Sequence, residues 1–267
     1  MDLNTDITAY LKELHMPTVR GLFPQMAEAA RNSSQSYEEY LFELLREEIQ
    51  VRRQNRIQRL LKESRLPLEK NFESFDLKRL GPKLSSQVNI LKDGSFLDRS
   101  ENVLAFGNPG SGKTHLVCAL GQELIYQGRR VICYSTAYLV QRMLIAKREL
   151  RLERFIKSLA KYDALIIDDI GYVEQNREEM EVLFSLFAER YERGSIILTS
   201  NLPFSKWEKI FKDPMTAAAA IDRLIHHSII LELNLPSYRL EQSKNKQMKG
   251  GQTSSTRDSN EPSKREK

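Results

Sequence analysis

The segment that most constrains the fold of this chain is Gly-Asn-Pro-Gly-Ser-Gly-Lys-Thr at residues 107–114. It matches in full the phosphate-binding loop pattern, in which Gly, any four residues, Gly, Lys, and Ser or Thr follow one another. The apolar run at 102–106 predicts a buried strand before the loop, and the sequence at 115–125 predicts a helix after it. This context makes a chance glycine-rich turn a poor explanation. We therefore expect the chain to bind a nucleoside triphosphate.

Each part of this loop has a chemical task. The glycines let backbone N–H groups turn toward phosphate oxygens, and the N-terminus of the following helix adds roughly half a positive charge. The Lys113 ammonium is expected to reach the β- and γ-phosphates, and the Thr114 hydroxyl to bind Mg²⁺. The expected nucleotide contacts are Gly107, Asn108, Pro109, Gly110, Ser111, Gly112, Lys113, Thr114 and His115.

A second nucleotide signature is the apolar run at 164–167, which ends in Asp168 and Asp169. Asp168, at the tip of a buried strand, can hold the Mg²⁺ shell opposite Thr114. Asp169, one residue later, can orient or deprotonate an attacking water. The alternative is an ordinary acidic turn after a strand, which the phosphate loop makes much less favoured.

Three later polar residues are candidates for the catalytic set. Asn201 follows a third apolar strand and can contact the γ-phosphate or the water; a turn asparagine is the alternative. Arg223 can complete a neighbouring subunit's site, because a planar guanidinium suits phosphate charge; a surface salt bridge is the alternative. Arg239 follows the last strand and can reach the nucleotide bound by its own subunit.

Length and composition are those of an ordinary soluble protein. The 267 residues, 40% hydrophobic and 29% charged, suffice for one large domain and a smaller one. No apolar run approaches the ~18 residues of a membrane span, and residues 1–4 do not begin a signal peptide. We therefore expect a cytoplasmic protein with no membrane partner. Cys118 and Cys133 lack metal or disulfide spacing and are expected to be buried apolar residues.

Periodicity and composition divide the chain into four segments. We expect a helical N-terminal domain at 1–72 that binds DNA or a partner, a connector at 73–101, a nucleotide-binding domain at 102–240 and a disordered polar tail at 241–267. The expected strands span 103–106, 130–134, 164–168, 195–199 and 228–233. Because these apolar runs alternate with helices, they predict an α/β fold with a parallel five-stranded sheet between helices.

The N-terminal segment carries the signals of helix ends. Thr5 or Asp6 can cap a short first helix, and residues 36–39 form a capping box at the start of a long helix that can reach Leu66. One face of that helix carries a polar, mostly cationic row: Arg52, Asn55, Arg59 and Lys62. A neighbouring apolar stripe is expected to pack on the domain: Phe42, Leu45, Ile49 and Leu60. The row suits sequence-independent binding to DNA phosphates, and a solvated charged face is the alternative.

Taken together, five segments closely resemble the IstB-type ATPases, helper proteins of bacterial insertion sequences, and more distantly the DnaC/DnaI helicase loaders. Both groups belong to the AAA+ class. The segments are 107–116, 165–172, 197–204, 221–227 and 236–240, and the resemblance extends over roughly residues 5 to 240. It implies an AAA+ P-loop core, ATP and Mg²⁺ as cofactors, and functional roles for Lys113, Thr114, Asp168, Asp169, Asn201 and Arg223.

Two departures from the general AAA+ pattern modify this expectation. Asp169 stands where Glu is usual, and its shorter side chain is consistent with slow hydrolysis. No helical lid is expected after the last strand, because only a polar tail follows it. In the AAA+ class a lid normally carries the arginine that corresponds to Arg239, so this chain departs from the pattern there.

The resemblance implies an ATP-dependent transposition helper that assembles as an oligomer on duplex target DNA and recruits or stimulates a transposase. A replicative helicase loader, with the same core and a different partner, is the closest alternative. An ATP-gated DNA-binding regulator without hydrolysis is a second, for which the Asp168–Asp169 pair is the relevant feature. A small-molecule kinase is least favoured, because no acceptor-binding lid follows the loop.

Overall fold

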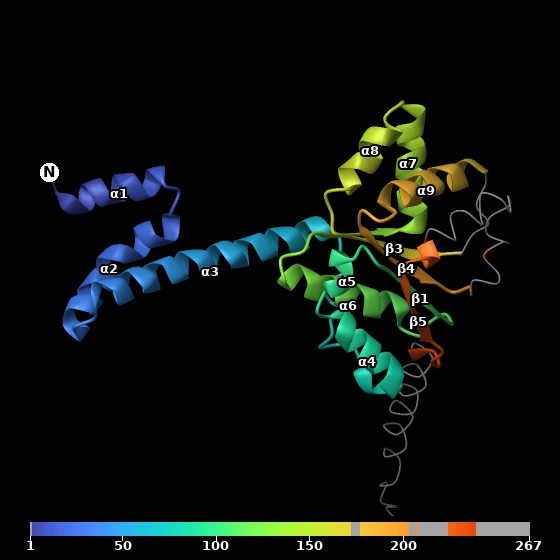
Figure 1. Cartoon of the computed structure of the whole chain (residues 1–267), viewed down its shortest axis with the longest axis horizontal. Coiled ribbons are helices and arrows are strands. Elements are labelled where there is room, and N and C mark those ends of the chain that lie inside the picture. The colour runs from blue at the N-terminus through green and yellow to red at the C-terminus, as the bar shows by residue number, and fades with distance from the viewer. Residues whose placement is uncertain (1, 172–176, 203–206, 208–223, 239–267) are drawn as a thin grey trace, which may run out of the picture. The chain divides into compact units, whose positions relative to one another are not determined.

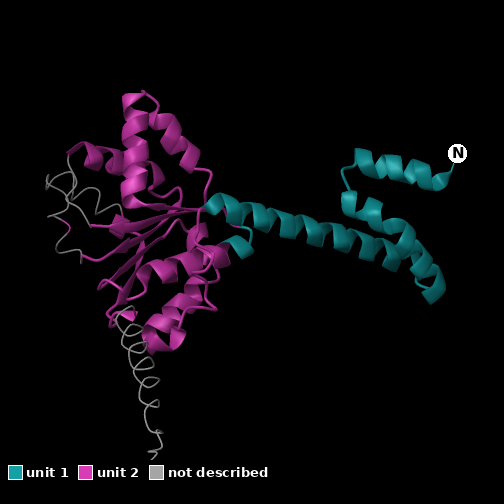
Figure 2. Ribbon diagram, turned by 180° about the vertical axis from the view of Figure 1, so that it is seen from behind, with its two compact units in different colours: residues 1–64, 125–128 teal, residues 65–124, 129–267 magenta. Residues whose placement is uncertain are grey.

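The computed structural model describes residues 2–171, 177–202, 207 and 224–238. Two compact units can be distinguished, and Figure 2 colours them separately. The first comprises residues 1–64 and 125–128, and the second comprises residues 65–124 and 129–267. Arg223, Arg239 and the tail at 241–267 lie outside the described residues.

The first unit contains three helices of the N-terminal segment: α1 (Leu3–Glu13), α2 (Pro17–Ser33) and α3 (Tyr37–Ser64) (Figure 1). Its core is formed by Val19 and Phe23 of α2 and Leu44 of α3. The prediction of Thr5 or Asp6 as the first cap was wrong. Asp2 caps α1 by accepting from the Asn4 N–H, because the helix begins at Leu3 and includes both predicted residues.

The start of α3 confirms the predicted capping box. The Ser36 N–H donates to Glu39 Oε2 at 2.9 Å, and the Glu39 N–H donates to Ser36 Oγ at 3.2 Å. The helix ends at Ser64, two residues before the expected Leu66, and Arg65 takes a positive φ of 60°. The long helix is therefore set at its start by local hydrogen bonds and ended by a left-handed residue.

The apolar stripe of α3 that was expected to pack on the domain is mostly exposed. Phe42 and Ile49 are 64% and 66% exposed, Leu45 is 39% exposed, and of the four only Leu60 is buried. The face of α3 that is buried in its N-terminal half instead carries Leu44 and Glu48. The prediction was wrong for Phe42, Leu45 and Ile49, because α2 packs on the neighbouring face of α3. Helical spacing alone does not say which of two adjacent stripes meets a partner.

The second unit is built on a sheet of five parallel strands: β1 (Asn102–Gly107), β2 (Val131–Ser135), β3 (Ala164–Ile170), β4 (Ser195–Ser200) and β5 (Ser228–Leu233). Their order is β2-β3-β4-β1-β5, which confirms the predicted parallel sheet. Because all strands run the same way, their carboxyl ends meet at one edge. The loop after β1 and the polar residues after β3 and β4 therefore gather there.

Helices cover both faces of this sheet. On one face lie α7 (Thr136–Arg148), α8 (Leu152–Leu159) and α9 (Arg177–Arg190), and on the other lie α4 (Pro82–Leu91) and α6 (Lys113–Tyr126) (Figures 1 and 2). The apolar faces of α7, α8 and α9 close a core against fully buried strand residues such as Leu165, Ile167 and Leu198. No helix in the described part of the chain is long and apolar enough to cross a membrane.

The segment expected as a connector, 73–101, is largely helical. It contains a 3₁₀ turn at Leu77–Arg79, α4 and the short α5 (Ser95–Asp98). Val88, Leu91, Phe96 and Leu97 are buried, so this polar-looking stretch contributes to the core of the second unit. The turn signals at 81–82 and 93–94 favoured a connector, although Leu84, Val88 and Leu91 recur at helical spacing between them.

Candidate nucleotide-binding site

The loop at 107–114 joins β1 to the first turn of α6, so the N-terminus of α6 faces the loop. Gly110 and Gly112 have φ of 80° and 99°, a conformation that L side chains rarely adopt. A Cβ added at Gly107 would collide with the carbonyl oxygen of Leu233 at the end of β5. The backbone thus needs glycine for both its turns and its close packing against the next strand.

Lys113 is 7% exposed, and its ammonium folds back over the loop. It donates to the carbonyl oxygens of Gly107 at 2.8 Å and Asn108 at 3.0 Å. Burial lowers the pKa of Lys113, and the nearby Asp169 and Asp168 carboxylates oppose that shift. Neutral carbonyls are weaker partners for an ammonium than an anion is, so a phosphate can displace them.

Thr114 and Asp168 meet across the carboxyl edge of the sheet. The Thr114 hydroxyl donates to Asp168 Oδ1 at 2.9 Å. Hydroxyl, carboxylate and phosphate oxygens are the ligands that Mg²⁺ takes, so this pair fits a Mg²⁺ ion carried by a nucleotide. Among the described residues, no three His, Cys, Asp or Glu side chains are grouped to hold a metal ion. A cation at this site would therefore need phosphate and water as its other ligands.

Asp169 lies beside this pair in an unusual backbone conformation, with a φ of 68°. Burial first, and then the negative charge of Asp168, raise the pKa of the Asp169 carboxyl, while Lys113 opposes the rise. A raised pKa makes a carboxylate a better proton acceptor. A partly buried carboxyl with a shifted pKa, such as that of Asp169, is typical of functional sites.

Asn201 follows β4, the strand that lies between β1 and β3 in the sheet. Its side-chain oxygen is buried and has no hydrogen-bond partner among the described residues. The same is true of the Ser111 hydroxyl in the phosphate loop. Buried polar atoms without partners are rare in proteins, and these two are the groups that a ligand or an ordered water would satisfy.

Two threonines that sequence analysis missed hold the acidic pair. The Thr199 hydroxyl donates to Asp168 Oδ1 at 2.6 Å and accepts from the Asp169 N–H at 2.7 Å. The Thr136 hydroxyl donates to the carbonyl oxygen of Asp168 at 3.0 Å. The sequence offered one indication of Thr199, because it is a polar residue near the end of an otherwise apolar strand.

A small cavity of about 40 Å³ adjoins the loop at Ser111 and Gly112. Its wall includes Phe75, His115 and Tyr238. The Tyr238 N–H donates to the Gly110 carbonyl at 3.0 Å, which ties the segment after β5 to the phosphate loop. His115 contacts the chain before β1 and shares its Nε2 with the Asn71 carbonyl at 2.9 Å. His115, which the sequence predicted as a nucleotide contact, therefore lies in the wall of this cavity beside the loop.

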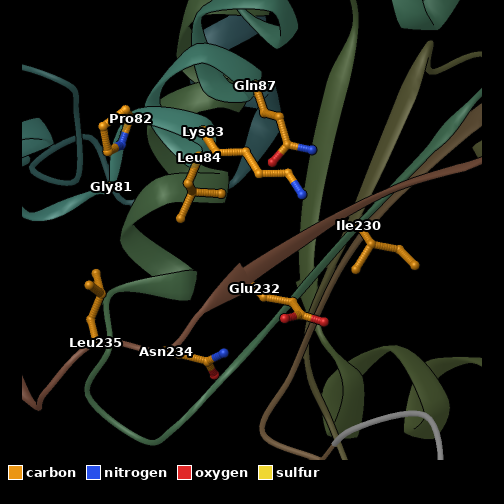
Figure 3. Close-up of a pocket in the computed structure, with 9 residues that line it drawn as sticks. All are labelled: Gly81, Pro82, Lys83, Leu84, Gln87, Ile230, Glu232, Asn234 and Leu235. Atoms are coloured by element: carbon orange, nitrogen blue, oxygen red, sulfur yellow. The ribbon is translucent and has the colours of Figure 1, made fainter.

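A larger cavity of about 560 Å³ lies between α4 and β5 (Figure 3). Lys83 and Gln87 line it from α4, and Ile230 and Glu232 line it from β5. It contains none of the residues predicted for the nucleotide. Lys83 therefore lies in the same unit as Lys113 but outside the phosphate loop, and it can serve as a control for substitution of Lys113.

The predicted basic row on α3 is exposed, but its members differ in their contacts. Arg52 Nε donates to the buried Glu48 carboxylate at 2.7 Å, and its Nη2 donates to the His15 carbonyl. Arg52 is thus a structural link between α3 and the start of α2. Arg59 lies 4.0 Å from Glu63, a weak surface pair that leaves it available to phosphate.

A second basic surface lies on α7 and α8 and was not predicted. Residues 136–162 contain seven Lys or Arg and two Glu, so they carry as large an excess of positive charge as the whole chain, +5. Arg142, Arg151 and Arg154 line a cavity of about 610 Å³ there. Leu150, at the tip between the two helices, has a φ of 56° and is 94% exposed.

A phosphate loop opening a helix, an acidic pair on a strand separated from it by one strand, and this sheet order define a P-loop nucleotide-binding protein of the AAA+ class. The family model for IstB-like ATP binding proteins matches residues 9–246. The chain belongs to this family of ATP-binding proteins, which confirms the resemblance seen in the sequence.

Individual relatives agree with this assignment. An insertion-sequence ATP-binding protein of Sinorhizobium fredii is 43% identical over 230 residues, covering 86% of this chain and 77% of the relative. The ATP-binding protein of insertion sequence IS5376 from Geobacillus stearothermophilus is 39% identical over 236 residues, covering 88% and 94%.

Solved structures share the fold. AMPPCP-bound DnaA from Aquifex aeolicus aligns with a TM-score of 0.53 and 22% identity, over 74% of this chain and 58% of DnaA. DnaI aligns with a TM-score of 0.50 and 16% identity, over 63% of this chain and 95% of DnaI. At these identities the comparison supports the AAA+ architecture.

Proposed function

We propose that this chain is a Mg²⁺-dependent ATPase that binds duplex DNA and assists the transposase of an insertion sequence. The observation that carries the ATPase part is the hydrogen-bonded group in which Thr114 meets Asp168, with Asp169 next to it and buried Lys113 on the same side. The relatives' description as insertion-sequence proteins supports the transposition part.

In this proposal each residue has one task. Lys113 exchanges its loop carbonyls for the β- and γ-phosphates, and Thr114 with Asp168 holds the metal. Asp169 accepts a proton from the attacking water, and the Asn201 amide orients that water or the γ-phosphate. Bound Mg²⁺ supplies neutralisation of the developing phosphate charge. The wall with Phe75 and Tyr238 offers an aromatic surface for the nucleobase.

Nucleotide binding is tested by titrating a fluorescent ATP analogue into Lys113→Ala protein. Loss of one charge-assisted contact removes about 1.5–3 kcal/mol, so affinity should fall by roughly tenfold or more. Lys83→Ala is the matched control, because Lys83 lines the cavity shown in Figure 3 and not the loop. Equal affinities for the parent and Lys113→Ala would remove the loop from the site.

DNA binding has two candidate surfaces, the exposed row on α3 and the basic surface on α7 and α8. Both place several cations on one face, as phosphate binding requires. Arg59→Ala with Lys62→Ala tests the first, and Arg151→Ala with Arg154→Ala tests the second. Arg52 is kept, because it binds Glu48.

The readout for DNA binding is the slope of log affinity against log salt concentration for duplexes of unrelated sequence. Each lost phosphate contact should flatten the slope by roughly 0.9. A change in only one pair assigns the contact to that surface. Unaltered slopes for both pairs would contradict the DNA-binding proposal for these residues.

We further propose an ATP-dependent oligomer in which Arg223 acts on the neighbouring subunit's nucleotide, since a guanidinium suits transition-state phosphate charge. Arg223 lies outside the described residues, and the family resemblance supports this role. Mixing Arg223→Ala with Lys113→Ala protein is the test. Recovered turnover on mixing supports a shared site, and normal turnover by Arg223→Ala alone refutes it.

The helicase-loader alternative has the same core and a different partner. The fold similarity to DnaI does not distinguish the two, because it is 16% identical. Stimulation of turnover by the transposase of an insertion sequence supports the transposition helper. Stimulation by a replicative helicase and not by that transposase would favour the loader.

A further inference from the structure

The strand pairing that carries the acidic pair is irregular at the pair itself. Between β3 and β4 the register runs from Ile167 opposite Leu198 to Ile170 opposite Ser200. Two residues of β3, Asp168 and Asp169, therefore stand opposite the single residue Thr199 of β4. This is the arrangement of a β-bulge, which redirects side chains and leaves backbone groups without their usual ladder partners.

The Thr199 side chain supplies the partner that the bulge removes. Thr199 is 1% exposed, and its hydroxyl accepts from the Asp169 N–H at 2.7 Å. The same hydroxyl donates its one proton to Asp168 Oδ1 at 2.6 Å. One oxygen thus holds the backbone of one aspartate and the carboxylate of the other.

Asp169 needs such support because of its conformation. Its φ of 68° lies in the left-handed region, which a residue other than glycine keeps only when its surroundings fix it. Asp168 Oδ1 also accepts from Thr114, in the first turn of α6. The contacts of Thr199 therefore connect the conformation of Asp169 to the metal-binding pair.

We propose that Thr199 is a positioning residue for Mg²⁺-dependent turnover. Its hydroxyl holds the bulge so that the carboxylate of Asp168 faces Thr114 and that of Asp169 faces the attacking water. The inference rests on the proposed ATPase function and adds a residue to it. Thr199 touches neither nucleotide nor metal in this role, and acts through the two aspartates.

The test compares Thr199→Val, which keeps the shape and loses the hydroxyl, with Thr199→Ser, which keeps the hydroxyl. In Thr199→Val we expect kcat to fall about tenfold or more and half-saturation by Mg²⁺ to move to higher concentration. Analogue binding in EDTA should stay unchanged, because Lys113 and the loop are intact. Thr199→Ser should restore the parent Mg²⁺ dependence, and Ser195→Ala, at the other end of β4, is the matched control.

Thr199→Ala serves as a second variant without the hydroxyl. Parent-like kcat and Mg²⁺ dependence in either variant that lacks the hydroxyl overturns the proposal. So does loss of analogue binding in EDTA by both, because the hydroxyl would then only maintain the fold. Absence of turnover in the parent protein would refute the proposed ATPase, and the Mg²⁺ dependence of analogue binding would still report on Thr199.

Discussion

The helical unit and the sheet edge each contain a partly or fully buried carboxylate, and the two have opposite surroundings. Glu48 of α3 is 3% exposed and accepts from the N–H groups of Thr18 and Val19 and from Arg52. Burial alone would raise the pKa of Glu48, but these hydrogen bonds outweigh it and hold the pKa below its ordinary value. For Asp169, burial and the charge of Asp168 raise the pKa.

The difference separates a structural carboxylate from a functional one. Glu48 caps the first turn of α2 from another helix, so its charge stabilises the fold. Asp169 has a like charge beside it and a strained backbone, so its charge destabilises the fold. Residues of the second kind are kept where a ligand or a reaction needs them.

The largest expected effect that tests this contrast is on turnover. Asp169→Asn removes the proton acceptor and should lower kcat by about 10²-fold or more, while Asp168 and Lys113 still hold Mg²⁺ and ATP. Steady-state hydrolysis and analogue binding measure the two parts separately. Glu48→Gln should leave both unchanged per folded molecule. Turnover at the parent rate in Asp169→Asn would show that another group activates the water.

The second effect is on stability. Glu48→Ala leaves two N–H groups of α2 and the Arg52 guanidinium without their acceptor, which should cost about 2–3 kcal/mol of unfolding free energy. Amide hydrogen exchange at Val19 in the full chain measures the loss locally. Glu47→Ala, one residue earlier, is the control. If exchange at Val19 is equally slow in the Glu48→Ala and Glu47→Ala proteins, the cap is not a stabilising contact.

The sequence predicted what local patterns determine. The phosphate loop, the five apolar strands and the capping box at 36–39 depend on neighbouring residues, and the structure has the strands within two residues of the expected bounds. The position of Asp2 as first cap was missed because several polar residues compete at that end. Such competition is not resolved by spacing alone.

The remaining features depend on pairings between distant residues. Thr199 acquires its role from a bulge in the β3–β4 register, 30 residues away from Asp169. Arg52 was assigned to a DNA-binding face, and its contact with the His15 carbonyl, 37 residues earlier, follows only from the packing of helices. Periodicity identifies the faces of a helix or strand, but it does not identify the partner of each face.

A third effect, smaller than the second, is a gain in stability at the acidic pair. Asp169→Asn removes the repulsion with Asp168, and Asn tolerates a positive φ better than most residues. Without nucleotide, Tm should rise by about 2–4 °C, the equivalent of about 1 kcal/mol in a chain of this size. Asp169→Ala removes the charge but not the backbone strain, so its gain should be smaller. An Asp169→Asn protein with a lower Tm than the parent would contradict the assigned repulsion.

The smallest effect, and the most direct comparison of the two carboxylates, is the pH dependence of stability. The pKa of Glu48 is lowered, so its contribution is fully present above the unfolded value near 4.5 and is lost as pH falls through the folded pKa. The pKa of Asp169 is raised, so stability present below its unfolded value near 3.8 is lost as pH rises through the folded pKa.

The parent should therefore lose its stability advantage over Glu48→Gln as the solution is made more acidic. Asp169→Asn should gain stability relative to the parent as pH rises from about 4 toward neutrality. Urea unfolding at a series of pH values, followed separately for each unit by hydrogen exchange, measures both slopes. The unfolding free energy of the parent minus that of the variant should therefore rise with pH for Glu48→Gln and fall with pH for Asp169→Asn. If both differences change in the same direction with pH, the two carboxylates do not differ as proposed.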